Sequence, residues 1–223
     1  MTMQIFEEIE QGTDAWFECR MGIPTASMFA TVMASGRSGG ESKTRAKYMR
    51  QLAGEIICGA PTEGYSNASM DRGHVMEPQA RKRYAFLTDA EIKQVGFIRN
   101  GEKGCSPDSL VGANGMLEIK SKLPDLVIEC IERGSFPPEH KAQCQGGLWV
   151  AEREWIDIVV YWPGMPFFIK RAYRDEAYIA EMSRAVKVFN EELAELVERI
   201  RAYRPEPIPK EELPDAVKLM MAG

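Results

Sequence analysis

The feature that most constrains the fold of this chain is a predicted β-hairpin near its centre. Residues 105–121 contain the apolar segments CSPDSLV and MLEIKS, and the glycine- and asparagine-containing turn GANG lies between them. Side chains of a strand alternate between the two faces of a sheet. Glu118 and Lys120 therefore point to one face, and the hairpin brings Asp108 close to that face.

The residues next to these charges suggest that the hairpin does more than cover a surface. A Ser-Pro pair leads into Asp108, and the apolar Leu117 and Ile119 favour contact of the opposite face with a core. A charged face on a buried central strand is costly unless it is used. Two carboxylates and an ammonium match phosphodiester hydrolysis, in which the carboxylates hold divalent cations and the lysine orients or deprotonates water or offsets charge. The alternative is an ordinary surface hairpin with alternating Glu and Lys residues.

Helical patterns flank this strand-rich centre. Apolar spacing predicts helices at residues 14–20, 43–58, 70–87 and 138–151, and PTAS at 24–27 offers the cap of a further helix. Pro78 fits a helix only near its first turn. Apolar segments predict strands at residues 92–98, 155–162 and 166–171. The chain is therefore predicted to be an α/β protein with a central mixed β-sheet flanked by α-helices.

A long amphipathic helix near the C-terminus is the clearest single element. Its apolar stripe follows alternating spacings of three and four residues: Ile179, Met182, Val186, Phe189, Leu193, Leu196 and Ile200. We expect this helix to cover the sheet, and a coiled-coil contact between subunits is the alternative. From Pro205 the sequence becomes rich in proline. The expected organisation is one domain over residues 1–204 and a tail over residues 205–223.

Composition narrows the class of protein and of metal site. No apolar run reaches the roughly 20 residues of a membrane span, and the acidic N-terminus lacks a signal pattern, so we expect a cytoplasmic protein. The five cysteines form no C-x-x-C pair, and the two histidines lie far apart. A metal would therefore be held by carboxylates, which suit Mg²⁺ or Mn²⁺. The net charge of −5 does not exclude a locally basic surface that binds nucleic acid.

Four ordered blocks of sequence carry a resemblance to a known family. They are QGTDAWFECRMGIPTAS (11–27), RGHVMEPQAR (72–81), CSPDSLVGANGMLEIKSKLP (105–124) and HKAQCQGGLWV (140–150). With them the chain resembles the phage lambda exonuclease family, also called YqaJ-like viral recombinases, within the PD-(D/E)xK nucleases. The resemblance covers about the first 160 residues. It implies a restriction-endonuclease-like core.

The resemblance also implies roles for the residues of the hairpin. Asp108 and Glu118 would ligate the metal, and the backbone carbonyl of Ile119 would complete the site. The cofactor would be Mg²⁺, with Mn²⁺ as the alternative, bound as two ions. Lys120 would be the catalytic lysine.

Further roles carried over by resemblance concern residues outside the hairpin. Glu77 would position water or a second ion, and Gln143 would lie against the active site. Read without the family, Glu77 is a solvated glutamate and Gln143 a surface amide. Arg20, Ser27 and Ser106 would hold a 5′-terminal phosphate through charge-assisted hydrogen bonds. The plain alternatives are a surface salt bridge for Arg20 and a helix N-cap for Ser27.

The resemblance also implies contacts with DNA. Arg37 matches an arginine that reaches into the duplex, and Met70 matches an apolar wedge that parts the strands, although Met70 is as readily a core methionine. The family commonly has an aromatic residue where this chain has His140. Lysines are usual at Gly40 and Glu41, and the nearest replacements here are Lys43, Arg45 and Lys47.

The implied activity is processive 5′→3′ digestion of one strand of linear double-stranded DNA. The products would be 5′-mononucleotides and a 3′ overhang, for phage-type homologous recombination in a bacterial host. The expected partners are a single-strand annealing protein and further copies of the chain in a ring-shaped homotrimer. A restriction-like DNA endonuclease and a non-catalytic DNA-binding module are the competing functions.

Overall fold

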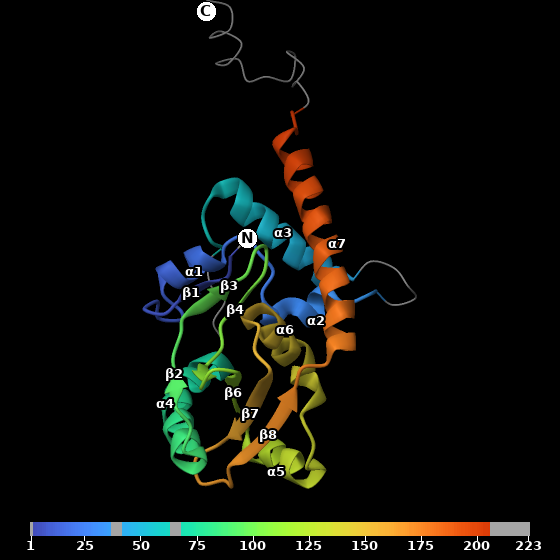
Figure 1. Ribbon diagram of the computed structural model, residues 1–223. Coiled ribbons are helices and arrows are strands. Elements are labelled where there is room, and N and C mark those ends of the chain that lie inside the picture. Colours follow the sequence, from blue (N-terminus) through green and yellow to red (C-terminus); the bar gives the residue numbers. More distant parts are fainter. Residues whose placement is uncertain (1, 37–41, 63–67, 206–223) are drawn as a thin grey trace, which may run out of the picture.

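The described residues of the protein form two β-sheets surrounded by helices (Figure 1). A computed structural model describes residues 2–36, 42–62 and 68–205, without the side chains of residues 68–74. The larger sheet has five strands in the order β2-β5-β6-β7-β8, and the smaller sheet has three in the order β1-β3-β4. In the larger sheet β6 and β7 are parallel and the other pairs are antiparallel. The predicted α/β fold with a central mixed sheet is therefore confirmed.

The five-stranded sheet is built around the predicted hairpin. Its strands are β2 (Ile92–Lys93), β5 (Ser109–Val111), β6 (Gly115–Ser121), β7 (Trp155–Tyr161) and β8 (Phe168–Tyr173). β5 pairs with β6 in the register Ser109 opposite Leu117, and a turn at residues 112–114 joins the two strands. Most residues of β6 and β7 are buried because helices cover both faces of these strands.

Residues 92–98 and 105–111 were each predicted to form one strand. Both predictions are wrong, because each segment is divided between the two sheets. The smaller sheet consists of β1 (Gln4–Phe6), β3 (Phe97–Arg99) and β4 (Gly104–Cys105). Residues 92–98 bend at Gly96, where an added Cβ would lie 1.9 Å from the carbonyl oxygen of Ile9. Residues 105–111 leave the ladder at Pro107, which has no N–H to donate. Asp108 therefore lies just before β5 and not on a strand.

Helix α4 (Ala68–Thr88) covers one face of the larger sheet. Its Ala80 and Tyr84 are fully buried against Leu117 and the neighbouring side chains of β7. Pro78 lies well inside α4, so the expectation that it must stand near the first turn is wrong. The exposed Pro78 costs the helix one hydrogen bond, while the buried residues that follow hold the helix against the sheet.

The opposite face of the sheet is covered by α6 (Lys141–Ala151), which follows the short helix η3 (Pro138–His140), and by α5 (Pro124–Arg133). Leu148 of α6 packs with Met116 and Ile158, and Val127 of α5 packs with Val160. No helix was predicted at α5. Its signals are a proline in the first turn, an apolar stripe and a left-handed glycine after its last residue.

The long helix α7 (Glu176–Arg201) buries the predicted stripe as far as Leu193, after which Val197 is buried and Ile200 is exposed. Its partners are α3 (Lys43–Cys58), the short α2 (Phe29–Val32) and α6, and Figure 1 shows it running beside α3 and away from the sheet. The expectation that α7 covers the sheet is therefore wrong, because α5 and α6 already occupy that face. Within the described ranges no helix, α7 included, combines the length and apolar character of a membrane span.

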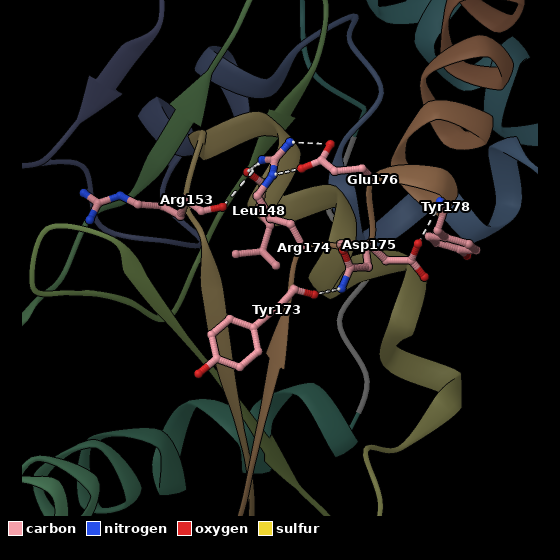
Figure 2. Close-up of polar contacts among 8 residues, drawn as sticks. Leu148, Arg153, Tyr173, Arg174, Asp175, Glu176 and Tyr178 are labelled. Atoms are coloured by element: carbon pink, nitrogen blue, oxygen red, sulfur yellow. Dashed lines mark hydrogen bonds and ion pairs between the residues drawn. The ribbon is translucent and has the colours of Figure 1, made fainter.

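A polar junction fixes α6 to the end of β8 (Figure 2). The guanidinium of Arg174 donates to the carbonyl of Leu148 at 2.8 Å, near the C-terminal end of α6. Gln145 donates to the carbonyl of Tyr173 at 2.9 Å and accepts from the N–H of Asp175 at 2.8 Å. These bonds join side chains to backbone groups of α6 and of the segment that follows β8. They hold α6, which contributes Gln143 and Gly147 to the wall of a pocket.

Candidate active site

A pocket of about 230 Å³ lies where β6, α4 and α6 meet the N-terminal helices. It is lined by all of the predicted site residues whose side chains the structure describes: Arg20, Ser27, Glu77, Ser106, Asp108, Glu118, Ile119, Lys120 and Gln143. Arg37 lies outside the described residues, and Met70 falls in α4 without a described side chain. Sequence segments separated by more than a hundred residues thus meet at one place.

Glu118 and Lys120 point to the same face of β6, as the strand alternation predicts. Lys120 Nζ lies 2.7 Å from Glu118 Oε1, and Gln143 Nε2 donates to the same oxygen at 2.6 Å. Burial lowers the pKa of Lys120, but the charges of Glu118 and Asp108 outweigh burial and raise this pKa above its usual value. Lys120 is therefore protonated, which favours a role in stabilising negative charge over a role as a proton acceptor.

Asp108 lies opposite Glu118 at the entrance to the hairpin. Its Oδ2 accepts a hydrogen bond from the backbone N–H of Ile119. Burial raises the pKa of Asp108 well above its ordinary value, and the charges of Glu118 and Glu77 raise it further. Such crowding of buried carboxylates is unfavourable without a compensating positive charge. Lys120 supplies part of that charge, and a bound cation would supply more.

Glu77 reaches the pocket from α4 and forms an ion pair with Arg81. The side chain of Glu77 is 23% exposed and that of Arg81 is 10% exposed. Glu77 is therefore not a solvated glutamate on the helix surface, which was the alternative to a role in the site. Gln143 likewise lies against Glu118 and is not a free surface amide.

The donor atoms of the hairpin fit a hard divalent cation. Asp108 and Glu118 offer carboxylate oxygens, and Ile119 also lines the pocket. Across the described ranges, no group of three His, Cys, Asp or Glu side chains forms a metal site by itself. The ligands that the resemblance implies are two carboxylates and the carbonyl of Ile119. This small set suits Mg²⁺, which keeps several of its waters in protein sites.

The other end of the pocket is built by α1 (Asp14–Arg20) and η1 (Ala26–Met28). The Arg20 guanidinium lies over the Trp16 ring, 3.7 Å from its centroid, and no described carboxylate forms an ion pair with it. The alternative of a surface salt bridge is therefore not what the structure shows. Burial lowers the pKa of Arg20, while Tyr48 opposes this shift. An arginine held in a pocket without an ion-pair partner is suited to binding an anion.

The hydroxyl groups at this end are held in place by side chains. Ser106 Oγ accepts from the indole N–H of Trp16 at 2.9 Å, and Ser27 Oγ lies 3.3 Å from Thr25 Oγ1. Ser27 lies inside η1 and caps no helix, so the N-cap alternative is wrong. Its hydroxyl instead lines the pocket.

Sequence reasoning assigned no role to Trp16, Gln11 or Thr25, although each lines the pocket. Gln11 donates to the carbonyl of Pro107 at 3.2 Å, next to Asp108. All three residues lie in the sequence block 11–27, which carries part of the family resemblance and could have identified them. Arg45 is not free to replace a DNA-binding lysine, because it pairs with Glu192 at 2.6 Å.

His140 occupies the position where the resemblance leads us to expect an aromatic residue. Its Nε2 is buried without a hydrogen-bond partner among the described residues. Burial, followed by the charges of Lys120 and Lys122, lowers the pKa of His140 to about 4, and Glu139 opposes the shift. The imidazole is therefore neutral near pH 7 and lies close to Lys120 and Lys122.

Solved structures share this architecture. The alkaline exonuclease LHK-Exo from Laribacter hongkongensis is 34% identical, with a TM-score of 0.76, and the match covers 85% of this chain and 96% of that one. LHK-Exo in complex with dAMP has the same TM-score and coverage at 36% identity. A phage related exonuclease from Haemophilus somnus 129PT, with 15% identity, a TM-score of 0.60 and coverage of 80% and 96%, shows likeness of fold alone.

The comparison of sequences with families points the same way. Among curated proteins, no sequence matches this chain. The model of the YqaJ-like viral recombinase domain matches residues 15–154, which include every described residue of the pocket except Gln11 and Ile156. The chain therefore belongs to the YqaJ-like viral recombinase family, and its structural neighbours are alkaline exonucleases.

Proposed function

We propose that this protein is a metal-dependent exonuclease that digests one strand of linear double-stranded DNA from its 5′ end. Family membership and the likeness to alkaline exonucleases support the nuclease role. The observation that carries the finer proposal is the pocket itself. It joins an acidic end containing Asp108, Glu118 and Lys120 to a second end where Arg20 has no described ion-pair partner.

The acidic end would cleave the phosphodiester bond. A divalent cation held by Asp108, Glu118 and the Ile119 carbonyl would polarise the scissile phosphate and help to activate water. Lys120, kept protonated by its acidic neighbours, would donate to a phosphate oxygen and stabilise the charge that develops on it. Gln143 holds Glu118 from the side of α6 and fixes its orientation.

The second end would select the 5′ terminus. A terminal phosphate dianion carries more charge than an internal phosphate and binds well to a guanidinium and nearby hydroxyls. Arg20, Ser27 and Ser106 supply these groups. Binding of the terminus here, with cleavage at the acidic end, would release 5′-mononucleotides and leave a 3′ overhang. The complex of LHK-Exo with dAMP supports a mononucleotide product.

The assembly and partners form a further part of the proposal. We infer that the chain forms a ring-shaped homotrimer around DNA and acts with a single-strand annealing protein in phage-type recombination. A closed ring would retain its substrate between turnovers and make digestion processive. Family membership supports this inference.

The test is a time course on linear duplexes in which one 5′ end is blocked. We expect Mg²⁺-dependent release of mononucleotides from the strand with the free 5′ end, loss of release with EDTA, and recovery when Mg²⁺ is added in excess. A closed circular plasmid should remain intact. Digestion from the 3′ end, or cleavage of the closed circle, would contradict the proposal, and so would full activity in EDTA.

A further inference from the structure

Arg81 is a buried cation that stands behind the wall of the pocket. It lies on α4, one turn after Glu77, and its side chain is only 10% exposed, but it does not line the pocket. A guanidinium has five N–H donors in a fixed planar fork, and burying it is costly unless those donors are used. The partners of Arg81 therefore show what the burial achieves.

Each of these partners lies on a different segment. Nη2 of Arg81 pairs with Glu77 on the same helix, and Nε donates to Ser109 Oγ of β5 at 3.1 Å. The amide oxygen of Gln94, turned toward the guanidinium, accepts from Nη1 and Nη2 at 3.0 and 3.2 Å. The fork thus joins α4 to β5 and to the segment between β2 and β3.

The contact with Ser109 leads directly to the acidic end of the pocket. Ser109 is fully buried, and its hydroxyl donates to the backbone carbonyl of Asp108. One guanidinium therefore contacts the Glu77 carboxylate and, through one hydroxyl, the backbone of Asp108.

We propose that Arg81 is a positioning residue that sets the placement of Glu77 relative to Asp108 across the acidic end of the pocket. The inference rests on the proposed nuclease function and names a residue behind that site. A simple ion pair between neighbouring turns would be exposed and would contribute little. The pair of Arg81 with Glu77 is buried, and Arg81 also contacts Ser109 of β5. These contacts are better explained if Arg81 fixes the positions of Glu77 and Asp108.

The first test compares Arg81→Met with Arg83→Met. Arg83 lies two residues further along α4, is exposed, and contacts Phe167 through its guanidinium, so it serves as a matched control. We expect Arg81→Met to lower kcat by roughly 10- to 100-fold with little change in KM, and to weaken Mn²⁺ binding by roughly tenfold in a direct titration. Arg83→Met should change both quantities less than about twofold. Unchanged Mn²⁺ affinity and kcat in Arg81→Met would overturn the inference.

A double-mutant cycle separates positioning from general stability. If Arg81 acts through Glu77, then Arg81→Met should cost less than about threefold in kcat when Glu77→Gln is already present. A purely structural role would give the same loss in both backgrounds, and that result would overturn the inference.

Arg81→Lys covers the case in which the methionine variant does not fold. Lysine keeps the charge but lacks the planar fork that contacts Glu77 and Ser109 together. We expect a folded protein with kcat still reduced at least about fivefold; wild-type kcat in this variant would overturn the inference. Activity of the unmodified protein is measured first. If that protein releases no nucleotides, the proposed function itself fails, whereas activity without coupling between Arg81 and Glu77 refutes this inference alone.

Discussion

The two ends of the pocket differ in how their charges are compensated. At the acidic end, which the hairpin forms, Glu118 is already contacted by Lys120 and Gln143. Asp108 accepts a hydrogen bond there from the backbone of β6. At the other end, Arg20 rests on the ring of Trp16 with no described ion-pair partner. One end is thus organised before substrate arrives, while the other keeps a positive charge available for an incoming anion.

This difference suggests that the hairpin end carries out the chemistry and that the Arg20 end selects the DNA terminus. Groups fixed in advance stabilise a transition state without reorganising during the reaction. A charge without an ion-pair partner contributes most when it meets a ligand of opposite charge. Changes at the hairpin end should therefore reduce catalysis on every substrate, whereas changes at the Arg20 end should alter the preference among DNA ends.

The largest effect is expected for Lys120→Ala. Removing the ammonium should lower kcat by roughly 100- to 1000-fold on all duplexes, because one donor to the developing charge is lost. The exposed Lys170→Ala provides a matched control and should stay near wild-type activity. Melting curves establish that both variants are folded. Near wild-type kcat in a folded Lys120→Ala would contradict the assignment of the hairpin end to chemistry.

A smaller and more selective effect is expected for Arg20→Ala. On duplexes with a 5′-phosphate, kcat/KM should fall roughly 10- to 100-fold, which corresponds to the loss of a charged hydrogen-bonding partner. On duplexes with a 5′-hydroxyl, the same variant should lose far less. Initial rates on matched pairs of duplexes give the comparison directly. An equal loss on both kinds of end would remove the distinction between the two ends of the pocket.

The arrangement of residues at the hairpin end could be predicted from the sequence because it depends on local patterns. A turn and the alternation of one strand place Glu118 and Lys120 on one face, and Asp108 lies only ten residues away. The contacts of Trp16 with Ser106 and of Arg81 with Ser109 join residues 90 and 28 positions apart. Such contacts depend on the packing of whole elements, which periodicity does not report.

The errors in the fold prediction have the same origin. The stripe of α7 shows that one face is buried but not which element buries it, so the contact with α3 was missed. Apolar runs at residues 92–98 and 105–111 show extended structure but not the transfer of the chain from one sheet to the other. Pro107 and Gly96 mark these transfers only once the neighbouring strands are known.

Beside the hairpin end, His140 should make stability depend on pH. Its pKa is about 4 in the folded protein against 6.5 for an ordinary histidine, so the unfolded chain binds a proton first as pH falls. Stability is therefore fully present above pH 6.5 and declines toward pH 4, by at most about 1.4 kcal/mol per pH unit. Denaturant unfolding of the protein and of His140→Phe in EDTA tests this. If the difference in unfolding free energy between the two did not change with pH, the burial of a neutral His140 would be refuted.

The smallest effect is expected outside the pocket, at the anchor of α4. Tyr84 donates to the buried Asp157 at 2.7 Å, and Arg171 contacts the same carboxylate. Tyr84→Phe should lower the free energy of unfolding by about 1.5 kcal/mol, with kcat within about twofold of wild type. Chemical denaturation and initial rates measure the two quantities. A large fall in kcat without loss of stability would show that this anchor belongs to the active site.

The most direct test of the account is whether the hairpin end binds a cation. Anomalous diffraction from crystals grown with Mn²⁺ would locate the ion and its ligands. We predict a manganese peak in contact with carboxylate oxygens of both Asp108 and Glu118. Well-ordered carboxylates that turn away from each other, with no anomalous peak between them at saturating Mn²⁺, would contradict the account.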